Sequence, residues 1–463
     1  MKKVLISAIL VISLLSIPVA EAFEIKIIED RLSLHANEIP LQSILQRLVN
    51  QGVKVRIDPQ INPKITGSFI NRDIRQGLDS VLKSLDHVLV WKSIAGPFGS
   101  IIKLDEIHVF RLGKKGLIRP LIPTVGRSID RDPQDGSTFI KNELLLRLKP
   151  GVTLSEFKRI LEKLGGTVLD GNTAVGIYRI LLPENSDIPT LIESISDHPG
   201  IAKAEPNYAY PIPTPYRNPS LSAASFPAFP NIHAPEGTAP VAIIDTGLAQ
   251  GSGLEGYVLA SLDILNPEKP LSDPLGHGTQ MALIAAGIVK PYGARDTTGT
   301  FNPIIPIRAF DDSGYISNFD IIHSIDFAVK NGARVMSLSW GSEIRSDFLE
   351  DDLDYAASKG LIVVASAGNE PTGRRVYPAA FRSVIGVGAL GPDGKPWENS
   401  NYGDFVMLRA PGFAWLPVGY KGEPGTYAGT SISTAFVANH IASFLSQKPD
   451  ATINEILNYL ASQ

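Results

Sequence analysis

Four side chains in the second half of the chain could together carry out nucleophilic acyl transfer. Asp245 stands in DTG, His277 in GHGT, Asn369 in SAGN and Ser431 in GTS. A serine hydroxyl attacks a carbonyl efficiently only when an imidazole takes its proton, and the imidazole needs a carboxylate that fixes its tautomer. An asparagine amide, together with a backbone N–H of the serine, can donate to the oxyanion that forms. The four residues therefore predict a serine-based catalytic site.

Each of these residues also has an ordinary structural explanation when it is considered alone. Ser431 or Asp245 could be a cap, His277 could be an ordinary histidine at a helix N-terminus, and Asn369 could stand in a turn. The stretch YAGTSISTAFVANH, residues 427–440, however, crowds hydroxyl groups directly before an apolar helical run. A serine at that point lies at the positive end of a helix, which favours its use as a nucleophile.

The region from residue 213 to residue 463 must supply the framework that brings these side chains together. Apolar strand patterns alternate there with amphipathic helix patterns, with strands at 241–244, 334–339, 361–365 and 384–389 and helices at 277–286, 318–330 and 348–359. This alternation predicts an α/β domain with a doubly wound parallel sheet. Active sites of such sheets lie beyond the carboxyl ends of strands, which is where Asp245 and Asn369 are expected.

The motifs DTG, GHGT, SAGN and GTS, in this order, resemble those of the subtilases, the subtilisin-like serine endopeptidases. The similarity spans residues 241–445 and includes VMSLSWG, YPA and APG. The resemblance implies a subtilisin-like catalytic domain that hydrolyses peptide bonds through an acyl-enzyme and needs no cofactor for the chemistry. It assigns an Asp–His–Ser triad to Asp245, His277 and Ser431. It gives Asn369 the role of stabilising the oxyanion.

The same resemblance implies where the substrate binds. VMSLSWG looks like the strand that holds the substrate backbone, which gives this role to Ser339, Trp340 and Gly341. Val376, which precedes a Tyr-Pro pair, looks like the base of the pocket for the residue before the scissile bond. A stiff β-branched side chain there predicts a preference for Ala or Val over Phe or Tyr at this substrate position.

The sequence departs from the usual subtilase pattern in two places. Gln280 stands where the motif GHGTH has its second histidine, and Ala435 and Phe436 replace a proline and a histidine after the serine. None of these side chains is a reacting group, so we expect them to affect the rate and the helix entry rather than the reaction. Residues 290–302 contain no evident acidic calcium cage. No metal ligand is therefore predicted, and structural calcium is left open.

Residues 138–212 form a smaller α+β pattern, in which a strand at 143–148 precedes a helix that begins with the capping box Thr153-x-x-Glu156. Alone, this pattern also fits a plain ferredoxin-like domain. LLLRLKPGVTLSEFKRILEKLGGTVLDG and the closing AEPNY, however, resemble a subtilase propeptide. The resemblance implies a domain that assists folding, then inhibits the enzyme and is removed by self-processing. We do not expect cleavage directly after Tyr210, because Pro211 would then be the first residue after the scissile bond. The cut is expected elsewhere in the proline-rich stretch.

Residues 23–112 carry two amphipathic helix patterns separated by strand-like runs, which predicts a second small α+β domain. Its segment LSLHANEIPLQSILQRLVNQGVKVRIDPQINPKITGSF resembles the secretin and TonB short N-terminal domain of bacterial outer-membrane systems. The resemblance implies docking to an outer-membrane or other envelope partner, and it implies no chemistry. Residues 113–137, which are polar and contain proline and arginine, are expected to form a linker.

Residues 1–22 predict a signal peptide, since two lysines precede an apolar run and Ala-Glu-Ala offers a cleavage site. An uncleaved anchor is the alternative, but the run is short for a full span. We therefore expect an exported protein that is periplasmic, associated with the outer membrane or extracellular.

The composition argues against several other functions. A net charge of −4 offers no basic surface for nucleic acid. The absence of cysteine excludes disulfides and thiol catalysis. The eight histidines include no HExxH pair, which disfavours a zinc protease. Protein or peptide substrates are therefore the expected partners.

Two other interpretations are left open. DTG and DSG, around Asp245 and Asp312, could supply the carboxylate pair of an aspartic protease, although GHGT, SAGN and GTS would then be unexplained. The chain could also be a catalytically weak, subtilase-like envelope binding protein, although none of the triad residues is missing.

Overall fold

The computed structural model describes residues 23–28, 30–96, 99–121, 128–173, 175–214, 216–217, 237–294, 301–418 and 424–462. The expected signal peptide, residues 1–22, lies outside the described residues. The chain divides into two compact units, Met1–Ile94 with Ile101–Gly126, and Ala95–Ser100 with Arg127–Gln463. We describe each unit by itself. No helix in the described ranges is long and apolar enough to cross a bilayer.

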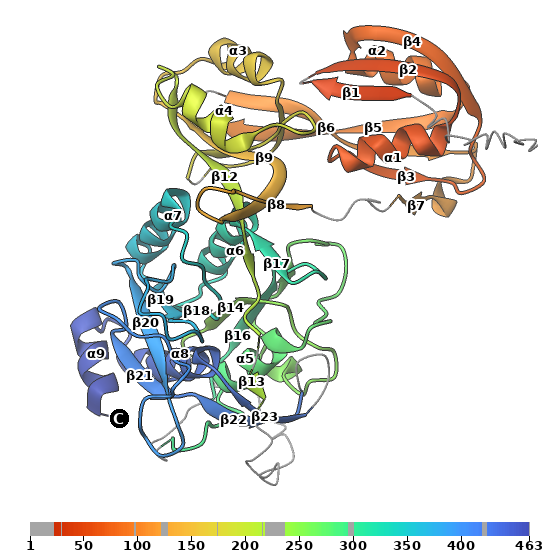
Figure 1. The fold of residues 1–463 in the computed structure, drawn as a ribbon. Coiled ribbons are helices and arrows are strands. Elements are labelled where there is room, and N and C mark those ends of the chain that lie inside the picture. The colour runs from red at the N-terminus through yellow and green to blue at the C-terminus, as the bar shows by residue number, and fades with distance from the viewer. Residues whose placement is uncertain are drawn as a thin grey trace, which may run out of the picture. The chain divides into compact units, whose positions relative to one another are not determined.

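The first unit contains two small sheets and two helices (Figure 1). Its elements are β1 (Glu24–Ile28), β2 (Arg31–Pro40), α1 (Leu41–Asn50), β3 (Lys54–Ile57), β4 (Lys64–Asp73), α2 (Ile74–Leu82), β5 (Asp86–Gly96), β6 (Gly99–Phe110), η1 (Lys115–Leu117) and β7 (Arg119–Pro120). The strand orders are β1-β2-β4 and β5-β6-β3-β7. Both helices are amphipathic and bury an apolar face in one core. The short β7 lies in the segment expected to be a linker and pairs with β3.

The second unit begins with a small antiparallel sheet and two helices. Its elements are β8 (Ile129–Arg131), β9 (Thr138–Leu148), α3 (Leu154–Leu164), β10 (Thr167–Asn172), β11 (Ile177–Leu181), α4 (Ile188–Ile195) and β12 (Ile201–Pro211). The strand order is β10-β11-β9-β12, and β8 pairs with β9. The predicted capping box is present, because Thr153 and Glu156 exchange side-chain to backbone hydrogen bonds at the start of α3. The far end of β12 pairs with β17 (Tyr315–Ser317) of the region that follows.

The rest of the second unit is built on a seven-stranded parallel sheet of order β15-β16-β14-β18-β19-β20-β21. Its strands are β14 (Val241–Asp245), β15 (Leu262–Asp263), β16 (Ile304–Arg308), β18 (Val335–Leu338), β19 (Ile362–Ser366), β20 (Val384–Leu390) and β21 (Leu408–Pro411). A small antiparallel sheet consists of β13 (Tyr216–Arg217), β23 (Gly425–Ala428) and β22 (Phe413–Leu416). The order of the parallel strands reverses at β14, so a crevice is expected beyond its carboxyl end.

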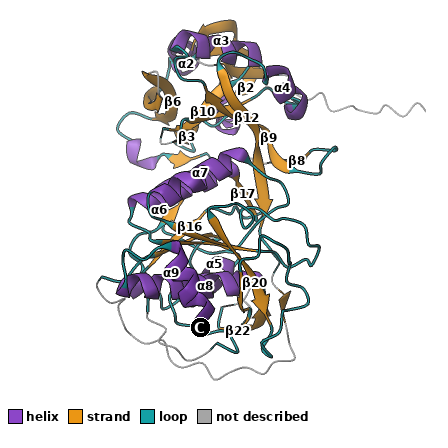
Figure 2. Ribbon diagram, turned by 90° about the vertical axis from the view of Figure 1, so that its left-hand side faces the viewer, coloured by secondary structure: helices purple, strands orange, loops and turns teal. Residues whose placement is uncertain are grey.

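Helices cover both faces of the parallel sheet (Figure 2). On one face α6 (Asn318–Lys330) and α7 (Asp347–Ser358) pack over a core that includes Ile244, Ile307 and Met336. On the other face lie α5 (His277–Ala285), α8 (Thr430–Gln447) and α9 (Ile453–Ser462). Helix α8 is buried along nearly its whole length and has no polar face. The predicted doubly wound parallel sheet is therefore confirmed.

Candidate active site

Asp245 and His277 meet at the carboxyl edge of the parallel sheet. Asp245 is the last residue of β14, and His277 is the first residue of α5. The Nδ1 atom of the histidine lies 2.8 Å from Oδ1 of the aspartate, and both side chains are almost completely buried. This contact leaves Nε2 as the ring nitrogen that can exchange a proton with another group.

Two glycines let the loops that carry this pair approach each other closely. Gly247 has a φ of 119°, and a β-carbon there would lie 2.0 Å from the carbonyl oxygen of Ser272. A β-carbon on Gly278 would lie 2.4 Å from the carbonyl oxygen of Gly247. The N–H of Gly278 also donates to Thr246 Oγ1 at 2.7 Å. The distance between Asp245 and His277 is thus set by direct contact of the two loops.

Asp273 holds the first turn of α5 in place, which is a role that the sequence did not reveal. Its carboxylate accepts from the N–H of Gly276 at 2.7 Å and from the N–H and hydroxyl of Thr279 at 2.8 and 2.6 Å. Burial lowers the pKa of His277, but the neighbouring charge of Asp245, their hydrogen bond and the charge of Asp273 outweigh it. The pKa of His277 therefore lies above its usual 6.5.

Ser431 lies at the start of the buried helix α8, directly after the turn that leaves β23. Its hydroxyl donates to the carbonyl oxygen of Ser339 at 3.3 Å, which is long for a hydroxyl hydrogen bond. Its N–H belongs to the first turn of the helix, where N–H groups have no partner within the helix. Ser431 and His277 line the same small cavity.

Asn369 lines that cavity as well, three residues after β19 ends. Its Oδ1 accepts from both the N–H and the hydroxyl of Thr430, each at 2.9 Å. These two hydrogen bonds fix the orientation of the amide, so that the Nδ2 group is left to donate elsewhere. Thr430 therefore positions the Asn369 amide. The GTS motif contains this threonine, but the motif alone does not indicate its role.

The segment predicted to bind the substrate follows the carboxyl end of β18. Ser339 is buried beside Ser431, and its Oγ lies 3.5 Å from the carbonyl oxygen of that serine. Trp340 is also buried. Its indole N–H donates to the carbonyl oxygen of Ile244 at 3.1 Å, and its ring stacks on Tyr210. The backbone of this segment, rather than the two side chains, is therefore what a substrate could contact.

Val376 lies between two loop segments, the one that follows β18 and the one that follows β19. A β-carbon built on Gly341 would come within 2.6 Å of its Cγ1, and one built on Gly368 within 3.6 Å of its Cγ2. The half-buried valine thus occupies the space between these two glycines.

The segment after β12 leads into the same cavity. Strand β12 runs from the sheet that it forms with β9, β10 and β11 to β17 (Figure 1). The N–H of Ile212 then donates to the carbonyl oxygen of Gly314 at 2.8 Å. The next residues, Pro213 and Thr214, line the cavity with His277 and Ser431. Residues 216–217 form β13 and pair with β23. The described residues of this segment, 212–214 and 216–217, are called the tail: the first part reaches the cavity and the second pairs with β23.

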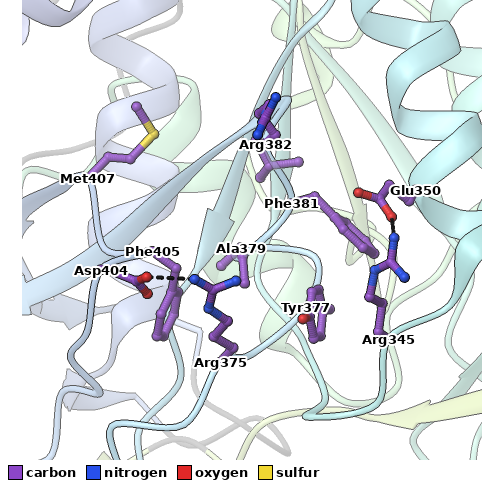
Figure 3. A pocket seen from close by; sticks show the side chains of 12 residues that line it. Arg345, Glu350, Arg375, Tyr377, Ala379, Phe381, Arg382, Asp404, Phe405 and Met407 are labelled. Atoms are coloured by element: carbon purple, nitrogen blue, oxygen red, sulfur yellow. Dashed lines mark hydrogen bonds and ion pairs between the residues drawn. The ribbon is translucent and has the colours of Figure 1, made fainter.

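A larger cavity of about 390 Å³ lies elsewhere in the catalytic region (Figure 3). Its lining includes Arg375, which pairs with Asp404 at 2.5 Å, and Arg345, which pairs with Glu350. None of the four residues predicted to be catalytic lines it, and four of its charged side chains are engaged in these two ion pairs. The smaller cavity beside Ser431 is thus the candidate site.

Within the described residues, no group of three or more histidine, aspartate or glutamate side chains is placed to hold a metal ion. Subtilases need no cofactor for catalysis. The loop in which a calcium cage was sought, residues 290–302, is only partly described, because residues 295–300 lie outside the described ranges.

An aspartate, a histidine and a serine gathered at the edge of a doubly wound parallel sheet are typical of one class of serine peptidases. In agreement, the profile of the subtilase family matches residues 238–462. Thermitase from Thermoactinomyces vulgaris is 32% identical over 219 residues, which is 46% of this chain and 77% of thermitase. The chain belongs to the subtilase family and is a subtilisin-like serine peptidase.

Other known proteins extend the similarity toward the N-terminus. The profile of the fervidolysin N-terminal prodomain matches residues 129–207. A thermophilic serine proteinase from Bacillus sp. strain AK1 is 28% identical over 318 residues, which is 67% of this chain and 79% of that protein. The crystal structure of fervidolysin from Fervidobacterium pennivorans, a keratinolytic enzyme related to subtilisin, has a TM-score of 0.53 at 23% identity. That similarity covers 69% of this chain and 57% of fervidolysin.

Proposed function

We propose that this subtilase is an exported endopeptidase in which Ser431 is the nucleophile, His277 the general base and Asp245 the carboxylate that orients it. The observation that carries this proposal is the contact of 2.8 Å between His277 and Asp245, at a cavity that the histidine shares with Ser431 and Asn369. The shared cavity supports the proposed roles of His277, Asn369 and Ser431, and the contact with His277 supports that of Asp245.

In the proposed reaction the Ser431 hydroxyl turns from the carbonyl of Ser339 to Nε2 of His277 and gives up its proton there. The serine oxygen bonds to the substrate carbonyl carbon, and the oxyanion accepts from the Ser431 N–H and the Asn369 amide. His277 then protonates the leaving amine as the peptide bond breaks. Water, deprotonated by the same imidazole, releases the acyl group and restores the serine. The charge of Asp245 stabilises the imidazolium in both halves of the reaction.

The aspartic protease alternative is disfavoured by the surroundings of its two carboxylates. Asp245 is buried and bonded to His277, whereas the side chain of Asp312 is 82% exposed and pairs with Arg308 at 2.6 Å. A catalytic carboxylate pair must instead share one proton. Peptide hydrolysis by the processed protein should therefore be abolished by a serine-reactive fluorophosphonate and unaffected by a pepstatin-like inhibitor. The reverse pattern would support the aspartic alternative, and no hydrolysis at all would support the binding-protein alternative.

Asn369→Ala should lower kcat by about 100- to 1000-fold with little change in KM, which is the loss seen when the equivalent donor is removed from a subtilisin. The amide is held by Thr430, so that its donor is placed before the oxyanion forms. Steady-state kinetics on a peptide substrate give both constants. Asn331→Ala is a matched control, because the Asn331 amide donates only to the end of α6. A rise in KM at unchanged kcat would mean that Asn369 binds the substrate without stabilising the oxyanion.

Val376→Gly should shift the preference for the residue before the scissile bond from Ala or Val toward Phe or Tyr. The two methyl groups fill the space between Gly341 and Gly368, where a larger substrate side chain would have to fit. Forcing extra carbons into a filled pocket costs about 1 to 3 kcal/mol, or roughly 10- to 200-fold in kcat/KM. A peptide series that differs only at this residue measures the ratio, and Val376→Ala should be intermediate. Wild-type enzyme that prefers Phe to Ala would contradict this assignment of the pocket.

We further propose that residues 138–212 are an inhibitory propeptide, preceding a catalytic domain at 213–463. On β12, Glu205 accepts from the Ser346 hydroxyl at 2.7 Å and from the N–H of Asp347 at 2.8 Å, which caps the start of α7. Arg147 and Lys203 both pair with Asp351 on that helix, at 2.6 and 3.0 Å. These contacts hold the small sheet against the catalytic region, and the tail that follows β12 lines the active-site cavity with Pro213 and Thr214.

Arg147→Glu in the full chain should therefore hasten the appearance of peptidase activity. The change replaces an ion pair with Asp351, and a cation stacked 5.0 Å from the Phe348 ring, by repulsion. One partly exposed pair contributes about 1 kcal/mol, so an effect of roughly fivefold at low salt is expected. Lys163→Glu, on the exposed side of α3, is a control of the same charge change. A lag equal to that of the wild type would contradict the proposed docking.

The remaining parts of the proposal concern location. Residues 1–22 are proposed to direct export, residues 23–112 to bind an outer-membrane or other envelope partner, and residues 113–137 to connect this domain to the propeptide. Sequencing the N-terminus of the exported product tests the first of these, and it shows which of the three segments the mature protein keeps. A product that begins at Met1 would contradict the signal peptide.

A further inference from the structure

Gln280, the residue that departs from the subtilase motif, faces the active-site cavity. It follows His277 by three positions on α5, so both side chains project from the same face of the helix. Only 1% of Gln280 is exposed, and it lines the cavity together with His277, Ser431, Tyr427 and Ala428. A side chain that is not a reacting group thus stands beside the reacting ones.

The Gln280 amide nitrogen is buried and has no hydrogen-bond acceptor in the described part of the chain. An unpaired buried donor costs free energy, so a glutamine is a poor choice for packing alone at this position. With Pro213 and Thr214 forming part of its wall, the cavity has a free volume of about 10 Å³, which is about the room one water needs. The donor is therefore available to a group that replaces the tail.

The tail indicates which part of a substrate would meet this donor. Before the cavity Ile212 bonds to Gly314, next to β17, and after the cavity β13 pairs with β23. A peptide bound in the same direction would place its residues before the scissile bond along β17 and its leaving residues along β23. Gln280 shares the cavity with Tyr427 and Ala428 of β23, and so it lies on the leaving side.

We propose that the Gln280 amide donates to the backbone carbonyl of the first residue after the scissile bond. This contact would hold the leaving residue while His277 delivers the proton to its amine. Gln280 is then a positioning residue for the leaving group and for the amine that enters in the reverse direction. The inference rests on the proposed function, because it presumes an acyl-enzyme at Ser431.

The test compares processed wild type with Gln280→Met, which keeps the length of the side chain and removes the donor. For a peptide with two residues after the scissile bond, kcat/KM should fall about 5- to 10-fold, which is the effect of one hydrogen bond. A p-nitrophenyl ester of the same acyl part, which has no leaving residue, should change less than about twofold. Equal losses on both substrates, or no loss on either, would overturn the inference.

A second measurement does not depend on how much of the variant folds. The acyl-enzyme formed from the ester is divided among water, glycinamide and ethylamine, and the ratio of the two amide products is measured. Wild type should favour glycinamide, which has the carbonyl, and Gln280→Met should lose about 5- to 10-fold of that preference, while Gln280→His, which restores an N–H donor, should keep most of it. An unchanged ratio in Gln280→Met would overturn the inference even though ester hydrolysis supports the proposed function. A wild type that hydrolyses no ester would contradict both.

Discussion

Ser431→Ala is expected to lower kcat for peptide hydrolysis by about a million-fold, as loss of the nucleophile does in a subtilisin, and to stop self-processing. Only a hydroxyl is removed, and its hydrogen bond to Ser339 is long at 3.3 Å, so the fold should be unaffected. Burst and steady-state kinetics, with circular dichroism as a check on folding, measure the effect.

The matched control for this variant is Ser433→Ala, two residues further along α8. Ser433 is also buried, and its hydroxyl donates to the carbonyl oxygen of Ala410 at 2.9 Å. Its loss should lower stability by about 1 kcal/mol and leave kcat within a few-fold of wild type. Residual activity of Ser431→Ala equal to that of Ser433→Ala would remove Ser431 from the mechanism.

Asp245→Asn is expected to lower kcat by about 10⁴-fold, because the amide holds the imidazole in the wrong tautomer. It should also move the pH profile. In the proposed mechanism His277 acts as the neutral base, and because its pKa is raised, activity should be lost as the pH falls through a value above 6.5. Asparagine removes the neighbouring charge, so the residual activity of the variant should persist to a lower pH than that of wild type.

Asp312→Asn is the control for this second variant, since Asp312 is the other carboxylate of the aspartic alternative. Its side chain is 82% exposed and pairs with the nearly buried Arg308, so kcat should stay within a few-fold and the pH profile should not move. Equal losses of activity in Asp245→Asn and Asp312→Asn would instead indicate that the two carboxylates act as a pair.

Much of the parallel sheet could be predicted because its strands are buried on both faces and appear as short apolar runs. Strand β16 was not predicted, since its sequence IIPIR contains Pro306 and follows Pro303, and proline is uncommon inside strands. Strand β12 was not predicted either. Its polar residues include Lys203 and Glu205, whose partners lie on α7 nearly 150 residues away, and no local pattern reports such contacts.

The identities of the candidate site residues could be predicted, because each of them stands in a short sequence motif. The structure brings Asp245 and His277 into contact, and Asn369 and Ser431 line the cavity that His277 also lines, while the catalytic roles of the four stay predictions. The supports could not be foreseen, because the bonds of Asp273 to the start of α5 and of Thr430 to the Asn369 amide depend on how the loops fold. The environment of Gln280 could not be predicted either. The sequence shows that this residue differs from the motif, but only the structure shows that its amide nitrogen is buried without an acceptor in the described part of the chain.

The most direct test of the account is to treat the processed protein with a fluorophosphonate and to locate the adduct by peptide mass spectrometry. The account predicts one phosphonyl group per chain on Ser431, with loss of peptidase activity in proportion to labelling and no adduct in Ser431→Ala. An active, folded protein that remains unlabelled, or one that carries the adduct on another residue, would contradict the assignment of Ser431 as the nucleophile.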